Sequence, residues 1–214
     1  MRFRDRADAG RRLAVQLSQY GGRDDVIVLA LPRGGVPVGA EVARTLAAPL
    51  DVFLVRKLGV PGHPELAMGA IASGGVRVLG DEIIRELAIP ASAIEAVAAR
   101  EQVELTRRER LYRGERALPS LAQRTVILVD DGLATGATMQ AAVEASRTQQ
   151  PARIVVAVPV GAPDTCERLR QIADEVVCVE SPASFHAVGA WYERFDQTTD
   201  DEVLRTLAVV RSPA

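Results

Sequence analysis

Two adjacent acids and a run of small residues lie close together in TVILVDDGLATGATM (residues 125–139). Asp130 and Asp131 directly follow an apolar run, and small side chains and hydroxyls follow from residue 134. Carboxylates bind hydroxyls or a metal ion, and uncovered backbone N–H groups at the start of a helix bind a phosphate. One turn that offers both predicts a ligand such as a phosphorylated sugar. A plain strand–turn–helix connection with two solvated acids is the alternative, and the TGAT segment at this spacing makes it the weaker one.

A second glycine-rich turn, in ALPRGGVPVGAEVA (residues 30–43), follows the first apolar run of the chain. Arg33 supplies a cation there. Gly34 and Gly35 let the backbone approach a ligand closely, just before an expected helix N-terminus. These features predict a second anion site, suited to another phosphate. A simple Pro-Gly turn has the same composition, so the interpretation depends on its partner at Asp130.

Two adjacent cations, Arg56 and Lys57, follow the next expected strand, in DVFLVRKLGVPGHPELAMG (residues 51–69). At the carboxyl end of a strand they could grip a polyphosphate, although a solvated basic pair is the plainer alternative. A loop rich in Gly and Pro is expected to follow them. Within it, His63 is expected to be an exposed residue, and Glu65 is either a surface charge or an active-site acid.

Four of the eight aromatic residues lie in SFHAVGAWYERF (residues 184–195). They predict a packed satellite core, the slightly favoured interpretation. The alternative is a wall against the flat ring of a base, because an aromatic face stacks on a ring.

The elements that position these residues follow an alternating pattern. Short runs of aliphatic residues predict strands buried on both faces, and amphipathic stretches between them predict helices, so the sequence indicates an α/β domain with a mostly parallel central sheet. Ligands of such sheets bind outside the carboxyl ends of the strands. The expected strands are 26–31, 52–55, 126–129, 154–158 and 176–179. The expected helices around them are 8–20, 36–47, 139–147, 163–173 and 200–209.

The middle of the chain carries further elements. Residues 70–79 predict a hairpin with Gly74 and Gly75 at its turn. A short helix is expected at 83–88 and a long charged one at 92–113, which Ser92 and Glu95 would start as a capping box. The charged helix is a solvated face, a lid or a subunit contact.

The composition excludes several classes of protein. The chain has 214 residues, a net charge of −2 and 48% hydrophobic residues. This balance gives no basic surface for nucleic acid or anionic membranes, and no apolar run approaches the roughly 20 residues of a membrane span. A cytoplasmic protein is therefore expected. Cys166 and Cys178 are expected to be free thiols rather than a disulfide.

Residues 126–139 resemble the binding motif for 5-phosphoribosyl 1-diphosphate in type I phosphoribosyltransferases. PRGG at 32–35 is similar to that family's pyrophosphate loop, and VRKLGVPG at 55–62 to the Arg-Lys segment before its mobile catalytic loop. The resemblance covers roughly residues 26–179 and is greatest to a bacterial group described only as predicted phosphoribosyltransferases. It implies one domain over residues 1–214, with an insertion at about 73–118 and a base-binding hood formed partly by 180–195.

The resemblance also implies roles for single residues. Asp130 and Asp131 would hold the ribose 2- and 3-hydroxyls, directly or through Mg²⁺ and water. Arg56 and Lys57 would stabilise the leaving diphosphate, with Glu65 as a further catalytic candidate. The residues that contact the diphosphate would be Arg33, Gly34 and Gly35. The residues that wrap the 5-phosphate would be Ala134, Thr135, Gly136, Ala137 and Thr138.

The activity implied is Mg²⁺-dependent transfer of phosphoribose to a nitrogenous base, with release of diphosphate, by a homodimer. The alternative is a regulatory protein that binds the phosphoribosyl donor without catalysis. Members that use 6-oxopurines usually carry an acid where this chain has Ala134, so hypoxanthine and guanine are disfavoured as acceptors.

Overall fold

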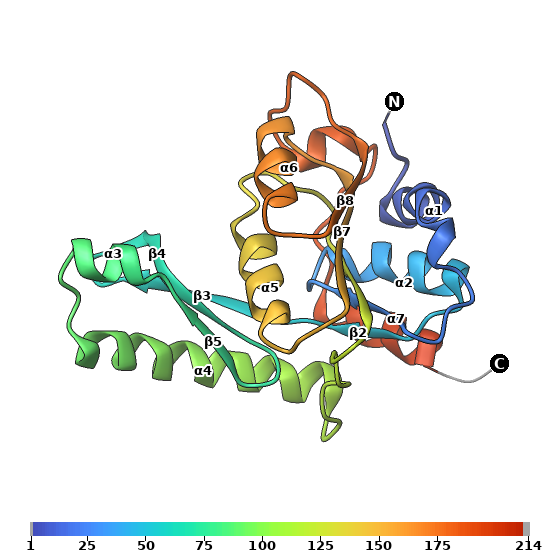
Figure 1. Ribbon diagram of the computed structural model, residues 1–214. Helices are drawn as coiled ribbons and strands as arrows, with labels where there is room; N and C mark the ends of the chain where they lie inside the picture. Colours follow the sequence, from blue (N-terminus) through green and yellow to red (C-terminus); the bar gives the residue numbers. More distant parts are fainter. Residues whose placement is uncertain (1, 212–214) are drawn as a thin grey trace.

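The computed structural model describes residues 2–211, apart from the side chains of residues 64, 65 and 211. Its centre is a five-stranded parallel sheet in the order β2-β1-β6-β7-β8 (Figure 1). This confirms the predicted α/β class. The strands are β1 (Val26–Ala30), β2 (Leu50–Val52), β6 (Thr125–Val129), β7 (Arg153–Val160) and β8 (Glu175–Glu180).

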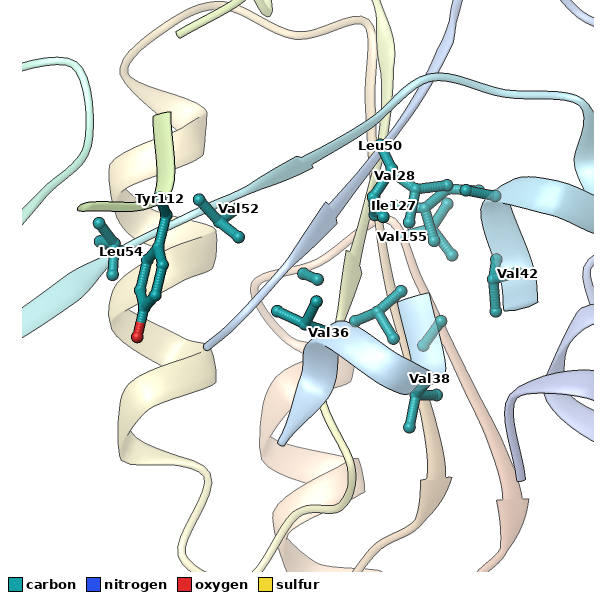
Figure 2. Close-up of a cluster of buried hydrophobic side chains, with 14 of the residues drawn as sticks. Val28, Val36, Val38, Val42, Leu50, Val52, Leu54, Tyr112, Ile127 and Val155 are labelled. Atoms are coloured by element: carbon teal, nitrogen blue, oxygen red, sulfur yellow. The ribbon is translucent and has the colours of Figure 1, made fainter. Parts of the chain in front are cut away.

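Helices cover both faces of this sheet, so β1 and β6 are buried along their whole length, and all their residues except Thr125 are apolar. Successive side chains of a strand point to opposite faces. Val28 and Ile127 therefore pack with one set of helices (Figure 2), and Leu29 and Leu128 with the other. On the first face lie α1 (Arg6–Gln16), α2 (Gly35–Leu46) and α7 (Asp200–Arg211). On the second face lie α5 (Ala137–Arg147) and α6 (Pro163–Arg170).

A small antiparallel sheet in the order β3-β4-β5 extends from the core together with two helices (Figure 1). We call residues 55–113 the arm. Its elements are β3 (Val55–Val60), β4 (His63–Ala72), β5 (Val76–Leu79), α3 (Asp81–Glu86) and α4 (Ala91–Arg113). The turn between β4 and β5 contains Gly74 and Gly75, whose φ angles of 84° and 75° suit glycine, as predicted.

The prediction of a loop after Arg56 and Lys57 is wrong. Residues 55–72 form the β3–β4 hairpin instead, with a tight turn at Pro61 and Gly62. Gly62 adopts a φ of 81°, which lets the chain reverse within two residues. The strand predicted at 52–55 is likewise divided, because β2 ends at Val52 and β3 begins at Val55.

The prediction of a capping box at the start of α4 (Ala91–Arg113) is also wrong. The helix begins at Ala91 after Pro90, so Ser92 already lies inside its first turn and no side chain caps it. Glu95 instead accepts a hydrogen bond from Arg77 of β5 at 2.9 Å. The first helix is also shorter than predicted: α1 ends at Gln16, and a separate 3-10 turn, η1 (Ser18–Tyr20), follows.

The last turn of α4 attaches the arm to the central sheet. Arg113 is buried there, and its Nε lies 3.2 Å from Oδ2 of Asp51 in β2. The same guanidinium donates to the backbone oxygen of Val52 and, at 3.4 Å, to the hydroxyl of Ser73 beyond β4. One buried side chain thus connects both sheets.

Cys166 and Cys178 are free thiols, as predicted, the first buried and the second half-buried. Among the helices of residues 2–211, none combines the length and apolar character that crossing a membrane requires.

Candidate functional site

The two glycine-rich turns meet at one edge of the central sheet. β1 and β6 are parallel neighbours with Ala30 opposite Val129, so the residues after each strand leave the sheet side by side. The backbone N–H of Leu31 donates to the carbonyl of Val129 at 2.8 Å and joins the two exits directly. The site therefore lies at the carboxyl ends of the strands.

Asp131 and the 33–35 turn are in direct contact. A Cβ added to Gly34 would lie 2.0 Å from Oδ2 of Asp131, and one added to Gly35 would lie 2.6 Å from the carbonyl oxygen of Val129. No real Cβ fits at such distances, so glycine at both positions is what allows the acids and the turn to touch. The peptide bond between Pro32 and Arg33 in this turn is cis.

The two carboxylates are partly buried and repel each other. Burial and the neighbouring Asp131 charge raise the pKa of Asp130 well above its ordinary value, although its Oδ1 accepts the N–H of Asp131 at 2.8 Å. Burial raises the pKa of Asp131 as well, and Arg6 opposes that rise. A pair held in this way favours a ligand that brings hydroxyl groups or a cation.

Arg6, which sequence reasoning missed, is the counter-ion of Asp131. Its Nε donates to Oδ2 of Asp131 at 2.8 Å across 125 positions of sequence. The backbone oxygen of Asp131 accepts the hydroxyl of Tyr192 at 2.6 Å. Asp131 is therefore held at two points, its carboxylate by Arg6 and its backbone oxygen by Tyr192, and no local sequence pattern could have indicated these partners.

The aromatic segment forms the satellite core that the sequence favoured. The ring of Tyr192 lies 5.4 Å from that of Phe3 and 4.8 Å from that of Phe195, measured between centroids. Val188 of the 3-10 turn η2 (Val188–Trp191) approaches the loop after the acids, since a Cβ on Gly132 would lie 2.5 Å from it. Segment 185–195 therefore supports the site from one side.

The 134–138 loop is held by α6, whose residues were also missed by sequence reasoning. The hydroxyl of Thr165 donates to the carbonyl of Ala134 at 2.7 Å, and Arg168 donates to that of Thr135 at 3.1 Å. In a trans peptide the N–H points away from the carbonyl of the same unit. The N–H groups of Thr135 and Gly136 are therefore turned away from α6.

These N–H groups are available to a ligand. Within residues 2–211, the backbone N–H groups of Ala134, Thr135 and Gly136 donate to no protein acceptor. Gly136 has a φ of 75° and opens α5, whose positive end adds to the attraction for an anion. This geometry suits a phosphate.

The predicted cations lie on different elements. Arg33 has its Nη1 3.9 Å from Asp200, at the start of α7. Tyr112 of α4 donates to the same carboxylate oxygen at 2.5 Å, and burial raises the pKa of this tyrosine to about 12. Arg33 thus lies near an acid of α7 that α4 also contacts, and the sequence did not connect either helix with it.

Arg56 and Lys57 are consecutive residues of β3, and both border a cavity that α4 also lines. Arg56 donates to Glu101 of α4 at 2.5 and 2.9 Å. Lys57 borders a cavity of about 390 Å³ that Ala137 and Gln140 of α5 also line, so it lies close to the 134–138 loop. The side chain of Glu65 lies outside the described residues.

The carboxylates of Asp130 and Asp131 are the ligands at this edge that fit Mg²⁺. No group of three or more acidic, His or Cys side chains suited to a metal occurs in the described part of the chain. Mg²⁺ commonly takes one or two carboxylates and completes its shell with water and substrate oxygens. The residues therefore fit a magnesium ion that arrives with a phosphorylated ligand.

A family model and a curated relative that match this chain carry the same description. The family model described as "Phosphoribosyl transferase domain" matches residues 65–194. A Mycobacterium tuberculosis H37Rv protein named "Putative phosphoribosyl transferase Rv0571c" is 52% identical over 206 residues, which are 96% of this chain and 46% of that protein. The chain thus spans about half the length of this relative.

Two solved structures are also similar. The crystal structure of TT1426 from Thermus thermophilus has 46% sequence identity and a TM-score of 0.90, over 99% of this chain and 100% of that one. The AQ2163 protein from Aquifex aeolicus has 11% identity and a TM-score of 0.53 over 86% of this chain and 78% of that one, a likeness of fold alone.

Proposed function

The chain belongs to the phosphoribosyltransferase family, and on that premise we propose that it moves the 5-phosphoribosyl group of 5-phosphoribosyl 1-diphosphate to a nitrogenous base. The observation that carries this proposal is the contact between Gly34 and Asp131. It brings a candidate diphosphate turn against a sugar-binding acid, beside the 134–138 loop. Three groups of one ligand, its diphosphate, hydroxyls and 5-phosphate, match these three features.

The proposed seating of the donor follows from this arrangement. The N–H groups of Thr135 and Gly136 hold the 5-phosphate at the start of α5. Asp130 and Asp131 accept hydrogen bonds from the ribose 2- and 3-hydroxyls. The diphosphate lies over the 33–35 turn, where Arg33 adds a positive charge.

The chain's own charges suit the transition state of the transfer. When the bond between C1 of the ribose and the diphosphate oxygen breaks, positive charge develops on the sugar and negative charge on the leaving group. Asp130 and Asp131 lie on the sugar side, and Arg33 and Lys57 stabilise the diphosphate; fixed charges of this kind lower the barrier. Bound Mg²⁺ would neutralise further charge on the diphosphate.

The acceptor we propose is a nitrogenous base other than a 6-oxopurine. Ala134 is exposed and occupies the position where family members that use 6-oxopurines usually carry an acid. A methyl side chain offers no hydrogen bond to such a base. The proposed reaction therefore uses the donor, Mg²⁺ and a base from another class.

The test measures released diphosphate and new nucleotide after incubation with the donor, Mg²⁺ and a panel of purine and pyrimidine bases. We expect one base to give equal amounts of both products. The variant Asp130→Asn with Asp131→Asn is the control and should give neither. A protein that binds the donor but releases no diphosphate with any base would contradict the transferase proposal.

Such a result would support a second function, a module that binds the donor and regulates another process. The pair between Arg56 and Glu101 favours it, because this cation is held by α4 rather than free to stabilise a leaving group. A transferase must separate that pair or work with Lys57 and Arg33 alone. The base panel distinguishes the two functions.

A further inference from the structure

The guanidinium of Arg6 is fixed on three sides. Its side chain is 12% exposed; its Nε donates to Asp131 at 2.8 Å and its Nη1 to the backbone oxygen of Asp196 at 2.6 Å. Its central carbon lies 4.0 Å from the centre of the Phe195 ring, within the range of a cation–π contact. This geometry restrains the side chain more strongly than an ordinary surface ion pair does.

The segment that carries Arg6 is itself tied to the other end of the chain. The N–H of Phe3 donates to the carbonyl of Trp191, and the N–H of Glu193 donates to the carbonyl of Phe3, both at 2.8 Å. Asp5 caps α1 and pairs with Arg194 at 2.5 Å. Arg6 therefore follows an anchored backbone and does not reach the site from a free end.

The oxygen that Arg6 holds is the one that lies nearest to the 33–35 turn. Oδ2 of Asp131 accepts from Arg6 and would be 2.0 Å from a Cβ on Gly34, whereas Oδ1 would be 3.1 Å from it. Within residues 2–211, no other residue donates a side-chain or backbone hydrogen bond to Oδ1. The ion pair thus leaves the second oxygen for a ligand.

We propose that Arg6 is a positioning residue for the donor: it fixes the Asp131 carboxylate so that Oδ1 meets the ribose, and it does not itself touch the substrate. This inference rests on the proposed function and adds a residue to it. The three contacts of the guanidinium are with Asp131, Asp196 and Phe195, and of these only Asp131 belongs to the acid pair, so we expect its effect on binding to pass through Asp131. Without the guanidinium, Asp131 can rotate and its oxygen is no longer preorganised.

The experiment is calorimetry with three ligands. They are the donor, ribose 5-phosphate, which contains the sugar and 5-phosphate of the donor, and inorganic diphosphate, which is its leaving group. We expect Arg6→Gln to lower the affinities for the donor and for ribose 5-phosphate about tenfold, the scale of one hydrogen bond to a charged group. The affinity for diphosphate should stay within about twofold of the wild-type value. Arg6→Lys should recover part of the loss. The control Arg4→Gln removes an exposed cation of the same segment and should change none of the three affinities.

A second comparison tests whether Arg6 acts through Asp131. In an Asp131→Asn background, Arg6→Gln should cause little further loss, because coupled residues are not additive. Full additivity would show that Arg6 acts independently of Asp131, and an equal loss for diphosphate would show that its effect is not confined to ribose-containing ligands; either result would overturn the inference. If Arg6→Gln unfolds at the assay temperature, Arg6→Lys carries the test through its selective loss of ribose-containing ligands.

The outcomes separate this inference from the proposed function. Wild-type protein that binds the donor while both Arg6 variants bind it equally well contradicts the role of Arg6 alone. Wild-type protein that binds none of the three ligands contradicts the proposed function, and the inference with it.

Discussion

Gly34 lies directly against the carboxylate of Asp131, with space for a hydrogen but not for a methyl group. A Cβ at position 34 would stand 2.0 Å from Oδ2 and 2.5 Å from Cγ of Asp131. The same oxygen accepts the hydrogen bond of Arg6 at 2.8 Å. One carboxylate oxygen therefore joins the 33–35 turn, the end of β6 and the first turn of α1.

Gly34→Ala should displace the Asp131 carboxylate and separate it from Arg6. We expect donor affinity to fall about tenfold or more, on the scale of a lost charged hydrogen bond, as measured by calorimetry. Gly21→Ala is the matched control, because Gly21 has a φ of −68° and its Cβ would meet no atom closer than 3.3 Å. Equal affinities of wild type and Gly34→Ala would show that this contact has no bearing on the site.

Thr165→Val should loosen the 134–138 loop while keeping the size of the side chain. The hydroxyl lost holds the carbonyl of Ala134 at 2.7 Å and, with it, the orientation of the next N–H. We expect the affinity for ribose 5-phosphate to fall about fivefold, which corresponds to about 1 kcal/mol for one hydrogen bond. Thr206→Val, which removes a similar but exposed hydroxyl-to-carbonyl bond within α7, should leave it unchanged. A loss of the same size in both variants would exclude a specific role of Thr165.

Arg113→Ala should destabilise the protein, because it removes the buried guanidinium that pairs with Asp51 and binds Val52 and Ser73. Breaking a buried ion pair costs about 3 kcal/mol or more in free energy of unfolding, measured by urea denaturation. Arg116→Ala removes a less buried cation near the same helix end and should cost well under about 1 kcal/mol, as is usual for partly exposed polar contacts. Similar losses in both variants would contradict the anchoring role of Arg113.

Asp130→Asn should stabilise the protein at neutral pH while it weakens donor binding. Burial and Asp131 raise the pKa of Asp130 in the native state, so the folded protein binds this proton more tightly than the unfolded chain. Wild-type stability should then decrease as pH rises from the ordinary value of 3.8 through the raised pKa. The variant lacks this penalty, so it should be more stable than wild type at neutral pH, and the difference should disappear below the ordinary pKa of 3.8.

The control for that measurement is Asp24→Asn, which removes an exposed acid and should change stability little at either pH. Urea denaturation at a series of pH values measures all three proteins. An Asp130→Asn variant that is less stable than wild type at neutral pH would contradict the electrostatic description of the acid pair.

Local patterns predicted the central sheet because its strands are buried on both faces. β1 and β6 read as unbroken aliphatic runs, and the acids follow at the point where β6 leaves the core. The location of Asp130 and Asp131 at the carboxyl edge of the sheet followed as well. That β1 and β6 are neighbours, which brings the two turns together, is seen only in the folded sheet. The strands and the acids after β6 could be predicted because each depends on the types of only a few consecutive residues.

The errors occurred where composition did not determine the structure. The segment after Lys57 is rich in Gly and Pro, as a loop would be, yet only Pro61 and Gly62 form its turn. Ser92 and Glu95 have the spacing of a capping box, but the helix begins earlier, at Ala91 directly after Pro90. The pairing of Arg6 with Asp131 could not be predicted, because the two residues are 125 positions apart and only the folded chain brings them together.

The central claim is that the acids at the end of β6 and the loop that follows them bind 5-phosphoribosyl 1-diphosphate. Calorimetry with this ligand and Mg²⁺ tests the claim most directly, with wild type compared with Asp130→Asn combined with Asp131→Asn. We predict that the wild type binds and that the double variant loses at least about tenfold in affinity, as expected for lost hydrogen bonds to charged groups. Equal affinity of the two proteins, or no binding by the wild type, would contradict the claim.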